Sequence, residues 1–193
     1  MARIGPNAVI RVAEALDAVE GRPVAERLFQ AVGIRRYLDA PPRDMVAEDE
    51  VRSLHEELHR ALGDRRARSI GWIAGQRTAD YLLAHRIPAA VQRLLHWLPR
   101  RTAARVLSRA IAGHAWTFTG SGRLRVEPGN PTAFRIAHCP LCRGLHGAEP
   151  ACDYYVATFE RLFAVLIHAD ARATETACMA RGDAECRISI GWP

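Results

Sequence analysis

The sequence predicts an α+β fold in which helices come first and a small antiparallel sheet with one long helix follows. Two observations support this. Residues 1–114 carry apolar side chains at helical spacing, whereas from residue 115 short stretches alternate between apolar and polar residues around turn signals. Nearly half of the residues are apolar, enough for a sizeable core. We expect one domain over residues 1–193, with a helical part at 1–114 and a sheet-bearing part at 115–193.

Six helices are expected in the first part, because residues that favour helix ends bound each apolar pattern. Pro23 stands near the start of one pattern and Gly33 ends it. Gly71 and Gly75, four residues apart, indicate that another element packs closely on their helix. The predicted helical segments are 7–21, 23–33, 47–63, 65–87, 88–99 and 100–116.

The second part is expected to be mostly strands. Residues 115–139 contain period-two stretches around Gly-Ser-Gly and Pro-Gly-Asn-Pro turns, which predicts three short antiparallel strands. Residues 152–168 form a long amphipathic pattern, typical of a helix. Residues 171–178 and 184–192 alternate again and are joined by Met-Ala-Arg-Gly-Asp, so we expect them to pair as a hairpin.

The charge of the chain limits its partners. The formal net charge is +6, and all 27 basic side chains are arginines because the sequence contains no lysine. Guanidinium groups bind carboxylates and phosphates, which permits nucleic acid, anionic lipid or an acidic small molecule. No aromatic-interleaved basic stretch or helix-turn-helix pattern favours nucleic acid, so we expect none. Without a signal peptide or an 18-residue apolar run, a cytoplasmic protein is expected, and a peripheral location at a membrane surface is compatible with this.

The five cysteines all lie at or after position 139. Structural disulfides are not expected in the cytoplasm, so the clustering points to a metal or to redox chemistry. A turn between Cys178 and Cys186 would bring both sulfurs to one point, within reach of Glu175. The redox alternative lacks a thioredoxin-like context, and unconnected core cysteines are the other alternative. From spacing alone the further zinc ligands are either the Cys-x2-Cys pair or a third thiol, namely Cys139 with Cys142, or Cys152.

Aromatic, histidine and arginine side chains of the helical part are candidates for a small-molecule pocket. Aromatic residues are expected in the core or in a pocket wall, arginines at a rim would bind carboxylates, and a histidine could ligate the metal of a metal-centred ring. Histidines near helix ends more often satisfy terminal carbonyls, and exposed arginines are usually only solvated. The candidates are Trp72, Arg77, Tyr81, His85, Trp97, His114 and Trp116, together with Tyr155 of the long helix.

Signals for common enzyme classes are missing. The Gly-Ser-Gly at 120–122 lies in a predicted strand turn, so it is no dinucleotide-binding fingerprint. No phosphate-binding Gly-rich loop, nucleophile elbow or paired-carboxylate motif is present. These absences favour a binding protein over a stand-alone catalyst.

Residues 149–190, EPACDYYVATFERLFAVLIHADARATETACMARGDAECRISI, resemble the four-vinyl-reductase domain family, named after the J protein of bacteriochlorophyll biosynthesis. The pattern of Cys, Asp-Tyr-Tyr, a long helix, Glu-x2-Cys, Gly-Asp and a final Cys carries the resemblance. The preceding helices fit the family more loosely. With the segment HCPLCRGLHG, the chain is similar to the J-protein branch of the family.

This resemblance implies a fold shared with transport-particle subunits and with zinc-binding phenol-sensor domains. In those sensors a Cys before the long helix and an E-x2-C-x7-C arrangement hold zinc. The matching positions here are Cys152, Glu175, Cys178 and Cys186, with Cys139 and Cys142 as alternative ligands. Three thiolates and a carboxylate leave no open position, so the zinc would be structural. The family also implies a homodimer.

The resemblance further implies a role in bacteriochlorophyll biosynthesis. We expect an accessory or carrier protein that binds a tetrapyrrole, such as a magnesium porphyrin or a chlorophyllide precursor, and delivers it between enzymes such as the magnesium chelatase and the methyltransferase. The alternative is an 8-vinyl (4-vinyl) reductase, an oxidoreductase. Reduction needs a hydride or electron donor, and no nicotinamide, flavin or iron–sulfur signature is visible. A sensor module is a weaker third alternative.

Overall fold

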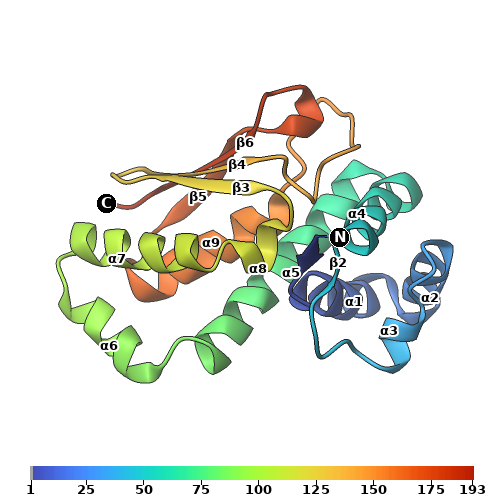
Figure 1. Cartoon of the computed structure of the whole chain (residues 1–193), viewed down its shortest axis with the longest axis horizontal. Helices are drawn as coiled ribbons and strands as arrows, with labels where there is room; N and C mark the ends of the chain where they lie inside the picture. The colour runs from blue at the N-terminus through green and yellow to red at the C-terminus, as the bar shows by residue number, and fades with distance from the viewer. Residues whose placement is uncertain (1) are drawn as a thin grey trace.

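The computed structural model describes residues 2–193. Helices fill the first part of the chain, and each of the six predicted helical segments is present (Figure 1). One further short helix occurs between the second and third of them. The bounds are α1 (Asn7–Glu20), α2 (Arg22–Ala31), α3 (Arg36–Asp39), α4 (Glu48–Leu62), α5 (Asp64–His85), α6 (Ala89–Trp97) and α7 (Arg100–Gly113).

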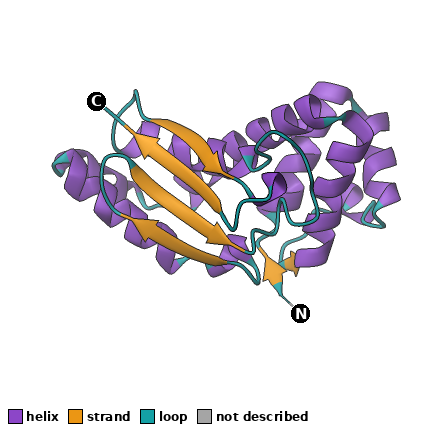
Figure 2. Cartoon of the chain, turned by 90° about the horizontal axis from the view of Figure 1, so that it is seen from above, coloured by secondary structure: helices purple, strands orange, loops and turns teal. Residues whose placement is uncertain are grey.

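A four-stranded antiparallel sheet forms the second part, which confirms the predicted α+β class (Figure 2). The strand order is β3-β4-β6-β5, so the last strand lies inside the sheet, between β4 and β5. The bounds are β3 (Arg123–Glu127), β4 (Thr132–Ala137), β5 (Arg172–Ala177) and β6 (Cys186–Gly191). The long helix α9 (Asp153–Leu166) connects β4 to β5, where the sequence predicted it.

The prediction of three strands within 115–139 is wrong. Two strands form, and the first stretch is instead a short helix, α8 (Trp116–Thr119). Hydrogen bonds explain the difference: the Thr119 hydroxyl donates to the Ala115 carbonyl at 2.9 Å, and the buried Tyr155 hydroxyl donates to the Phe118 carbonyl at 2.6 Å. Contacts with α9 therefore override the local alternating pattern.

Two smaller features were not predicted. A two-stranded sheet joins the N-terminus to the residues before α4, through β1 (Arg3–Ile4) and β2 (Val46–Ala47). The connection between β5 and β6 contains a 3-10 turn, η1 (Met179–Arg181), rather than a simple hairpin loop. The antiparallel pairing of β5 with β6 is nevertheless as predicted.

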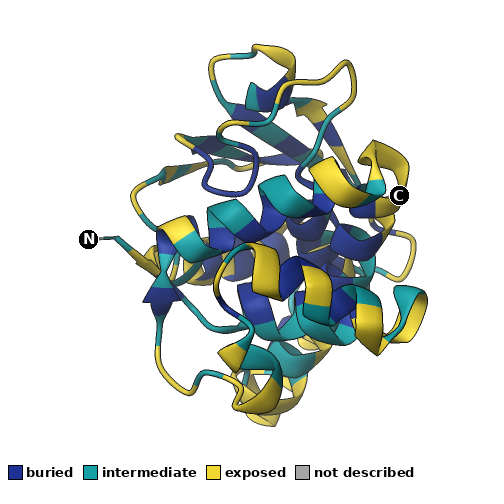
Figure 3. Cartoon of the chain, turned by 90° about the vertical axis from the view of Figure 1, so that its right-hand side faces the viewer, coloured by how far each residue is buried: buried dark blue, intermediate teal, exposed yellow. Residues whose placement is uncertain are grey.

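Helix α9 is the centre of the core. It lies between the sheet and the other helices (Figure 1), and nine of its fourteen residues are buried, so both of its sides face protein. On the sheet side Phe134 stacks on Phe159 with ring centroids 4.6 Å apart. Buried segments run through the middle of the molecule, and exposed ones lie on its outer turns and loops (Figure 3).

The other side of α9 packs tightly on α5. A Cβ atom on Gly75 would lie 2.2 Å from the Tyr154 carbonyl oxygen, so only glycine permits this approach. The Thr158 hydroxyl donates to the Gly75 carbonyl at 3.1 Å, and the hydroxyls of Thr78 and Tyr154 are 2.8 Å apart. The close packing expected at Gly71 and Gly75 is therefore present.

Helices α6 and α7 form a hairpin at the opposite end of the molecule from α2 (Figure 1). Only Leu95 of α6 is buried. The His96 ring nitrogen Nε2 lies 2.9 Å from the Val165 carbonyl oxygen and links α6 to the end of α9. No helix within residues 2–193 combines the length and apolar character required to cross a bilayer.

Candidate metal centre

Six side chains that can ligate a metal meet in one buried region at the end of the sheet. Four separate segments supply them: the loop after β4, the residue that precedes α9, the end of β5 with the residue after it, and the start of β6. All five thiols are buried, and the carboxylate is 9% exposed. In chain order the six are Cys139, Cys142, Cys152, Glu175, Cys178 and Cys186.

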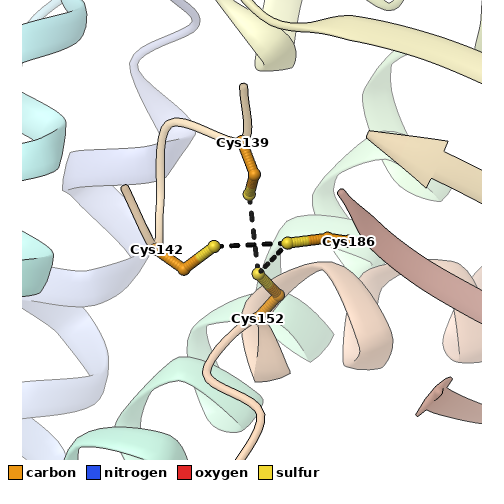
Figure 4. Close-up of side chains that lie close together, drawn as sticks. All are labelled: Cys139, Cys142, Cys152 and Cys186. Atoms are coloured by element: carbon orange, nitrogen blue, oxygen red, sulfur yellow. Dashed lines mark hydrogen bonds between the residues drawn. The ribbon is translucent and has the colours of Figure 1, made fainter. Parts of the chain in front are cut away.

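Four of the sulfur atoms form a compact group (Figure 4). The Sγ atom of Cys152 lies 3.5 Å from that of Cys139 and 3.5 Å from that of Cys186, and the Sγ atoms of Cys142 and Cys186 are 3.2 Å apart. A zinc ion with bonds of about 2.3 Å to each sulfur would set tetrahedral edges of about 3.8 Å. The spacing of these thiols therefore suits one zinc ion.

A second set of donors overlaps the first. The ligand atoms of Cys152, Glu175, Cys178 and Cys186 also lie within 4.8 Å of one another, and the sulfurs of Cys178 and Cys186 are 4.0 Å apart. The structure thus brings together the four ligands that the family pattern implied and both alternatives. The two sets share Cys152 and Cys186, and the choice between them stays a prediction.

Backbone geometry aims these donors inward. A register shift between Glu175 and Ala177 marks a bulge in β5, a feature that re-aims side chains. The turn that follows needs Gly182, whose φ of 91° is in the left-handed region. Asp183 holds this turn by accepting a hydrogen bond from the Cys178 amide at 2.7 Å. The turn therefore places Cys178 beside Cys186, as the spacing of the two cysteines predicted.

Amide groups also point at the donors. The Cys152 amide donates to Oε2 of Glu175 at 2.9 Å, the Ala151 amide to the Cys178 sulfur at 3.4 Å, and the Met179 amide to the Cys186 sulfur at 3.5 Å. Such donors stabilise negative charge on thiolates and carboxylates. The surroundings therefore favour the ionised, metal-binding forms.

The carboxylate of Glu175 indicates a cation at this place. Its Oε1 atom is buried and has no hydrogen-bond partner among the described residues. Burial, and then the neighbouring Cys178, raise the pKa of Glu175 to about 9. Burial likewise raises the pKa of Cys139, whereas hydrogen bonding to Cys142 lowers the pKa of Cys178 to about 6. A divalent cation would supply the missing partner of Glu175 and reverse the cost of ionising these groups.

These donors fit a zinc ion, and they fit a structural role. Four protein ligands leave no position for water or substrate. The thiols are buried, so no reactant reaches the ion without displacing protein. What such an ion would do is join the loop after β4, the start of α9 and the strands β5 and β6 into one unit.

The side chains predicted to line a pocket do not gather in one place. Trp97 is 87% exposed and Trp116 is 62% exposed, so the expectation that they lie in the core or a pocket wall is wrong. The reason is that α6 turns only Leu95 fully inward, and α8 is a single short turn. Tyr155, by contrast, is buried in the core and bonded to Phe118.

The remaining candidates lie on α5 and at the end of α7. Tyr81 and His85 stack with ring centroids 4.9 Å apart, and Arg77 pairs with Glu14 at 3.8 Å. Trp72 is half-buried against the core. His114 is exposed, and its Nδ1 atom lies 2.8 Å from the Ala110 carbonyl oxygen, the helix-end role that sequence reasoning considered commoner.

The larger of two open cavities lies beside the metal centre and has a volume of about 580 Å³. It is bounded by α4, the start of α5 and the loop before α9. His59 faces it, with Nδ1 2.8 Å from Asp64, so its Nε2 atom keeps a free lone pair. Carboxylates outnumber guanidinium groups in its wall: Glu56, Glu57, Asp64 and Glu149 against Arg60 and Arg68.

The second cavity is a groove of about 420 Å³ between α7 and β3. Ser108 is 2% exposed there, and its hydroxyl oxygen has no hydrogen-bond partner among the described residues. Arg105 and Arg109 flank it, and neither forms an ion pair within residues 2–193. Sequence reasoning missed this groove. The signal available was the run of arginines without acidic residues around α7. Apolar atoms of Ala112, Val126 and Pro128 complete its wall.

Comparison with known proteins gives three consistent results. The vinyl-4-reductase domain model matches residues 132–192, which contain the sheet strands β4 to β6 and the metal centre. The bacteriochlorophyll synthase 23 kDa chain of Cereibacter sphaeroides is 41% identical over 97% of this chain and 90% of its own length. The chain of the same description from Rhodobacter capsulatus is 38% identical over 95% of this chain and 84% of its own length.

A solved structure shares the fold along the whole length. It comes from work on the function of heme distortion in the H-NOX family, and it is 14% identical with a TM-score of 0.52, covering 98% of this chain and 95% of the other. The similarity extends over the helical part as well as the sheet.

Proposed function

Since this chain belongs to the family of the bacteriochlorophyll synthase 23 kDa chains, we propose that it is a tetrapyrrole-binding accessory protein of bacteriochlorophyll biosynthesis. It would carry a magnesium porphyrin or a chlorophyllide precursor between enzymes such as the magnesium chelatase and the methyltransferase. The proposal includes a J-protein identity, a homodimer, a location in the cytoplasm and a structural zinc ion.

The observation that carries this proposal is the 41% identity to a bacteriochlorophyll synthase chain over nearly the whole length. The fold adds support, because a protein studied for heme distortion has the same arrangement of helices and sheet. The pathway of the relatives therefore supplies the class of ligand, and the fold supplies a precedent for a tetrapyrrole.

The groove between α7 and β3 is the better place for such a ligand. A magnesium porphyrin bears carboxylates on an apolar ring, and carboxylates bind best to unpaired guanidinium groups in apolar surroundings. Arg105 and Arg109 provide these groups, and Ser108 provides a free hydroxyl. The cleft beside the metal centre is less suited, because its four carboxylates would repel those of the ligand.

The metal centre supports this site indirectly. One wall of the groove is β3, which pairs with β4 along its length. Two of the thiols, Cys139 and Cys142, follow β4 closely. A zinc ion held in this cluster would fix the β3–β4 hairpin relative to α9 and so keep the groove in shape.

Absorbance titration with magnesium protoporphyrin tests the proposal. We expect a shifted Soret band that saturates at micromolar protein with one ligand per chain. Replacing Arg105 and Arg109 together by Gln should weaken binding at least about 30-fold, because each charge-assisted hydrogen bond contributes about 1.5–3 kcal/mol. The matched control is Arg27→Gln with Arg43→Gln, which removes two exposed arginines that also lack ion pairs.

Three outcomes would count against the proposal. An unchanged spectrum at micromolar protein would exclude a tetrapyrrole carrier. Catalytic formation of an ethyl product from the pure protein, a divinyl substrate and reduced nicotinamide would establish the 8-vinyl reductase instead. Equal weakening by the groove variant and the control variant would move the ligand away from the groove.

A further inference from the structure

The basic residues of this chain are distributed very unevenly. Residues 81–126, from the end of α5 to β3, contain eight arginines and no aspartate or glutamate. The rest of the chain holds the other 19 arginines and all 21 acidic residues, a net charge of −2. The positive charge of the protein is therefore a property of this one segment, which includes the whole α6–α7 hairpin.

Few arginines in this segment are neutralised by the protein itself. Arg93 and Arg101 make no ion pair or hydrogen bond within residues 2–193, and Arg100 donates only to the Pro193 carbonyl, at 3.1 Å. Elsewhere most arginines pair with carboxylates, as Arg68 does with Asp153 and Arg187 with Glu127. The hairpin thus presents uncompensated positive charge.

The same hairpin exposes apolar side chains. Val91, Leu94 and Trp97 are 40%, 55% and 87% exposed, and their spacing of three residues places them along one outer face of α6. Five of the six large hydrophobic residues exposed among those described belong to residues 81–126, with Val106 and Trp116 completing the set. Exposed apolar residues among cations mark a surface that binds something.

We propose that the α6–α7 hairpin docks on an anionic lipid bilayer. Val91, Leu94 and Trp97 enter the boundary between headgroups and acyl chains, and Arg93, Arg100 and Arg101 bind lipid phosphates. A helix with an apolar face and arginines beside it has the properties of a membrane-surface helix, and tryptophan is favoured at that interface. The positive charge complements an anionic leaflet.

A second copy of the chain suits this surface poorly. In a two-fold dimer the same patch contacts itself, so the arginines of one hairpin would face those of the other. An anionic leaflet instead offers apolar depth and negative charge together.

Vesicle flotation with the full chain tests this docking in the absence of any tetrapyrrole. We expect binding to vesicles with about 30% phosphatidylglycerol in phosphatidylcholine, little binding to phosphatidylcholine alone, and weakening at about 0.5 M salt. Tryptophan fluorescence should shift to the blue on binding, and the shift should be mostly lost in Trp97→Phe, which keeps an apolar ring at that position.

Variants assign the effect to the hairpin. Arg93→Gln with Arg101→Gln should lower vesicle partitioning about 30-fold, since each arginine near an anionic surface contributes about a factor of five. Leu94→Ser with Trp97→Ser should lower binding to a similar degree. The matched controls are Arg43→Gln with Arg65→Gln, and Val19→Ser, which remove unpaired arginines and an exposed apolar residue outside the hairpin.

The result is decisive in either direction. Failure of the parent protein to bind anionic vesicles overturns the proposal and leaves an acidic protein surface as the partner of the hairpin. Equal loss in the hairpin variants and the controls overturns it as well. Because Arg93 and Arg101 lie outside the groove at Arg105 and Arg109, the hairpin variant should still bind magnesium protoporphyrin, so the two proposals can fail separately.

Discussion

Cys152 and Cys186 differ from the other thiols because both belong to each of the two four-donor sets. Glu175 and Cys178 belong to one set only, and Cys139 and Cys142 to the other. The two sets can therefore be told apart by single substitutions. Their overlap also means that two zinc ions could bind together only if the shared thiolates bridged them.

Substitution of the ligands should sort them into two groups. We expect Cys152→Ser, Cys186→Ser, Cys178→Ser and Glu175→Gln to lose zinc and to lower the melting temperature by about 10 °C, because ligand bonds that exist only in the folded state stabilise it. Cys139→Ser and Cys142→Ser should keep the metal. Metal analysis of the purified variants, together with thermal melts, gives both quantities.

The opposite pattern would assign the ion to the four cysteines instead. If Cys178→Ser retains zinc and melts like the parent while Cys139→Ser does not, the family pattern does not hold for this chain. A parent protein without bound zinc would remove the metal centre altogether.

His55 should make the stability depend on pH. It is 5% exposed, its Nε2 atom lacks a partner among the described residues, and burial lowers its pKa to about 3. In the unfolded chain this histidine takes up a proton below about pH 6.5, whereas in the folded protein it stays neutral. Stability is therefore lost as the pH falls from about 6.5 toward 3, and the loss reaches about 2–3 kcal/mol at about pH 4.5.

Urea denaturation at neutral pH and at about pH 4.5 measures this loss. The variant His55→Leu keeps an apolar side chain against Tyr154, whose ring centroid lies 6.1 Å from that of His55. It should lose less stability on acidification than the parent by about the same 2–3 kcal/mol. Identical pH dependence of the two proteins would show that His55 does not cause it.

At the scale of elements, the contact between α5 and α9 depends on Gly75. Gly75→Ala would force Cβ against the Tyr154 carbonyl, and we expect destabilisation of about 2 kcal/mol despite the gain in helix propensity. The control is Gly113→Ala at the end of α7, where nothing lies within 4 Å of the added carbon and a gain of up to about 1 kcal/mol is expected. Chemical denaturation compares them, and equal effects would contradict a tight contact.

Elements with a long repeating pattern could be predicted from the sequence, and short ones could not. Helix α9 and the β5–β6 pair follow from many residues that repeat one pattern, so local signals add up. Helix α8 has only four residues, and its alternating Trp-Thr-Phe-Thr is typical of a strand. Its conformation depends on the hydroxyl of Tyr155, which lies far away in the sequence. Pairing of that kind leaves no local trace.

For the whole molecule, the chemistry of the metal centre could be predicted but the ligand site could not. Thiols have few other roles in a cluster, so residue type and spacing nearly define their function. Tryptophan is usually buried, so sequence reasoning placed Trp97 and Trp116 in the core or a pocket wall. Their exposure is set by how α6 and α7 pack on the body, which single-residue tendencies do not contain. Charge segregation, by contrast, is visible in the sequence itself.

The order of the chain has a consequence for its synthesis. The ribosome releases α5, with the bare backbone of Gly75, long before it releases α9, which covers that surface. Cys186 emerges later still, so no nascent chain can close either thiol set around an ion until the last strand is out. Metal capture is thus a late checkpoint in maturation, and a truncated product would be left with an uncovered helix face that chaperones and proteases can recognise.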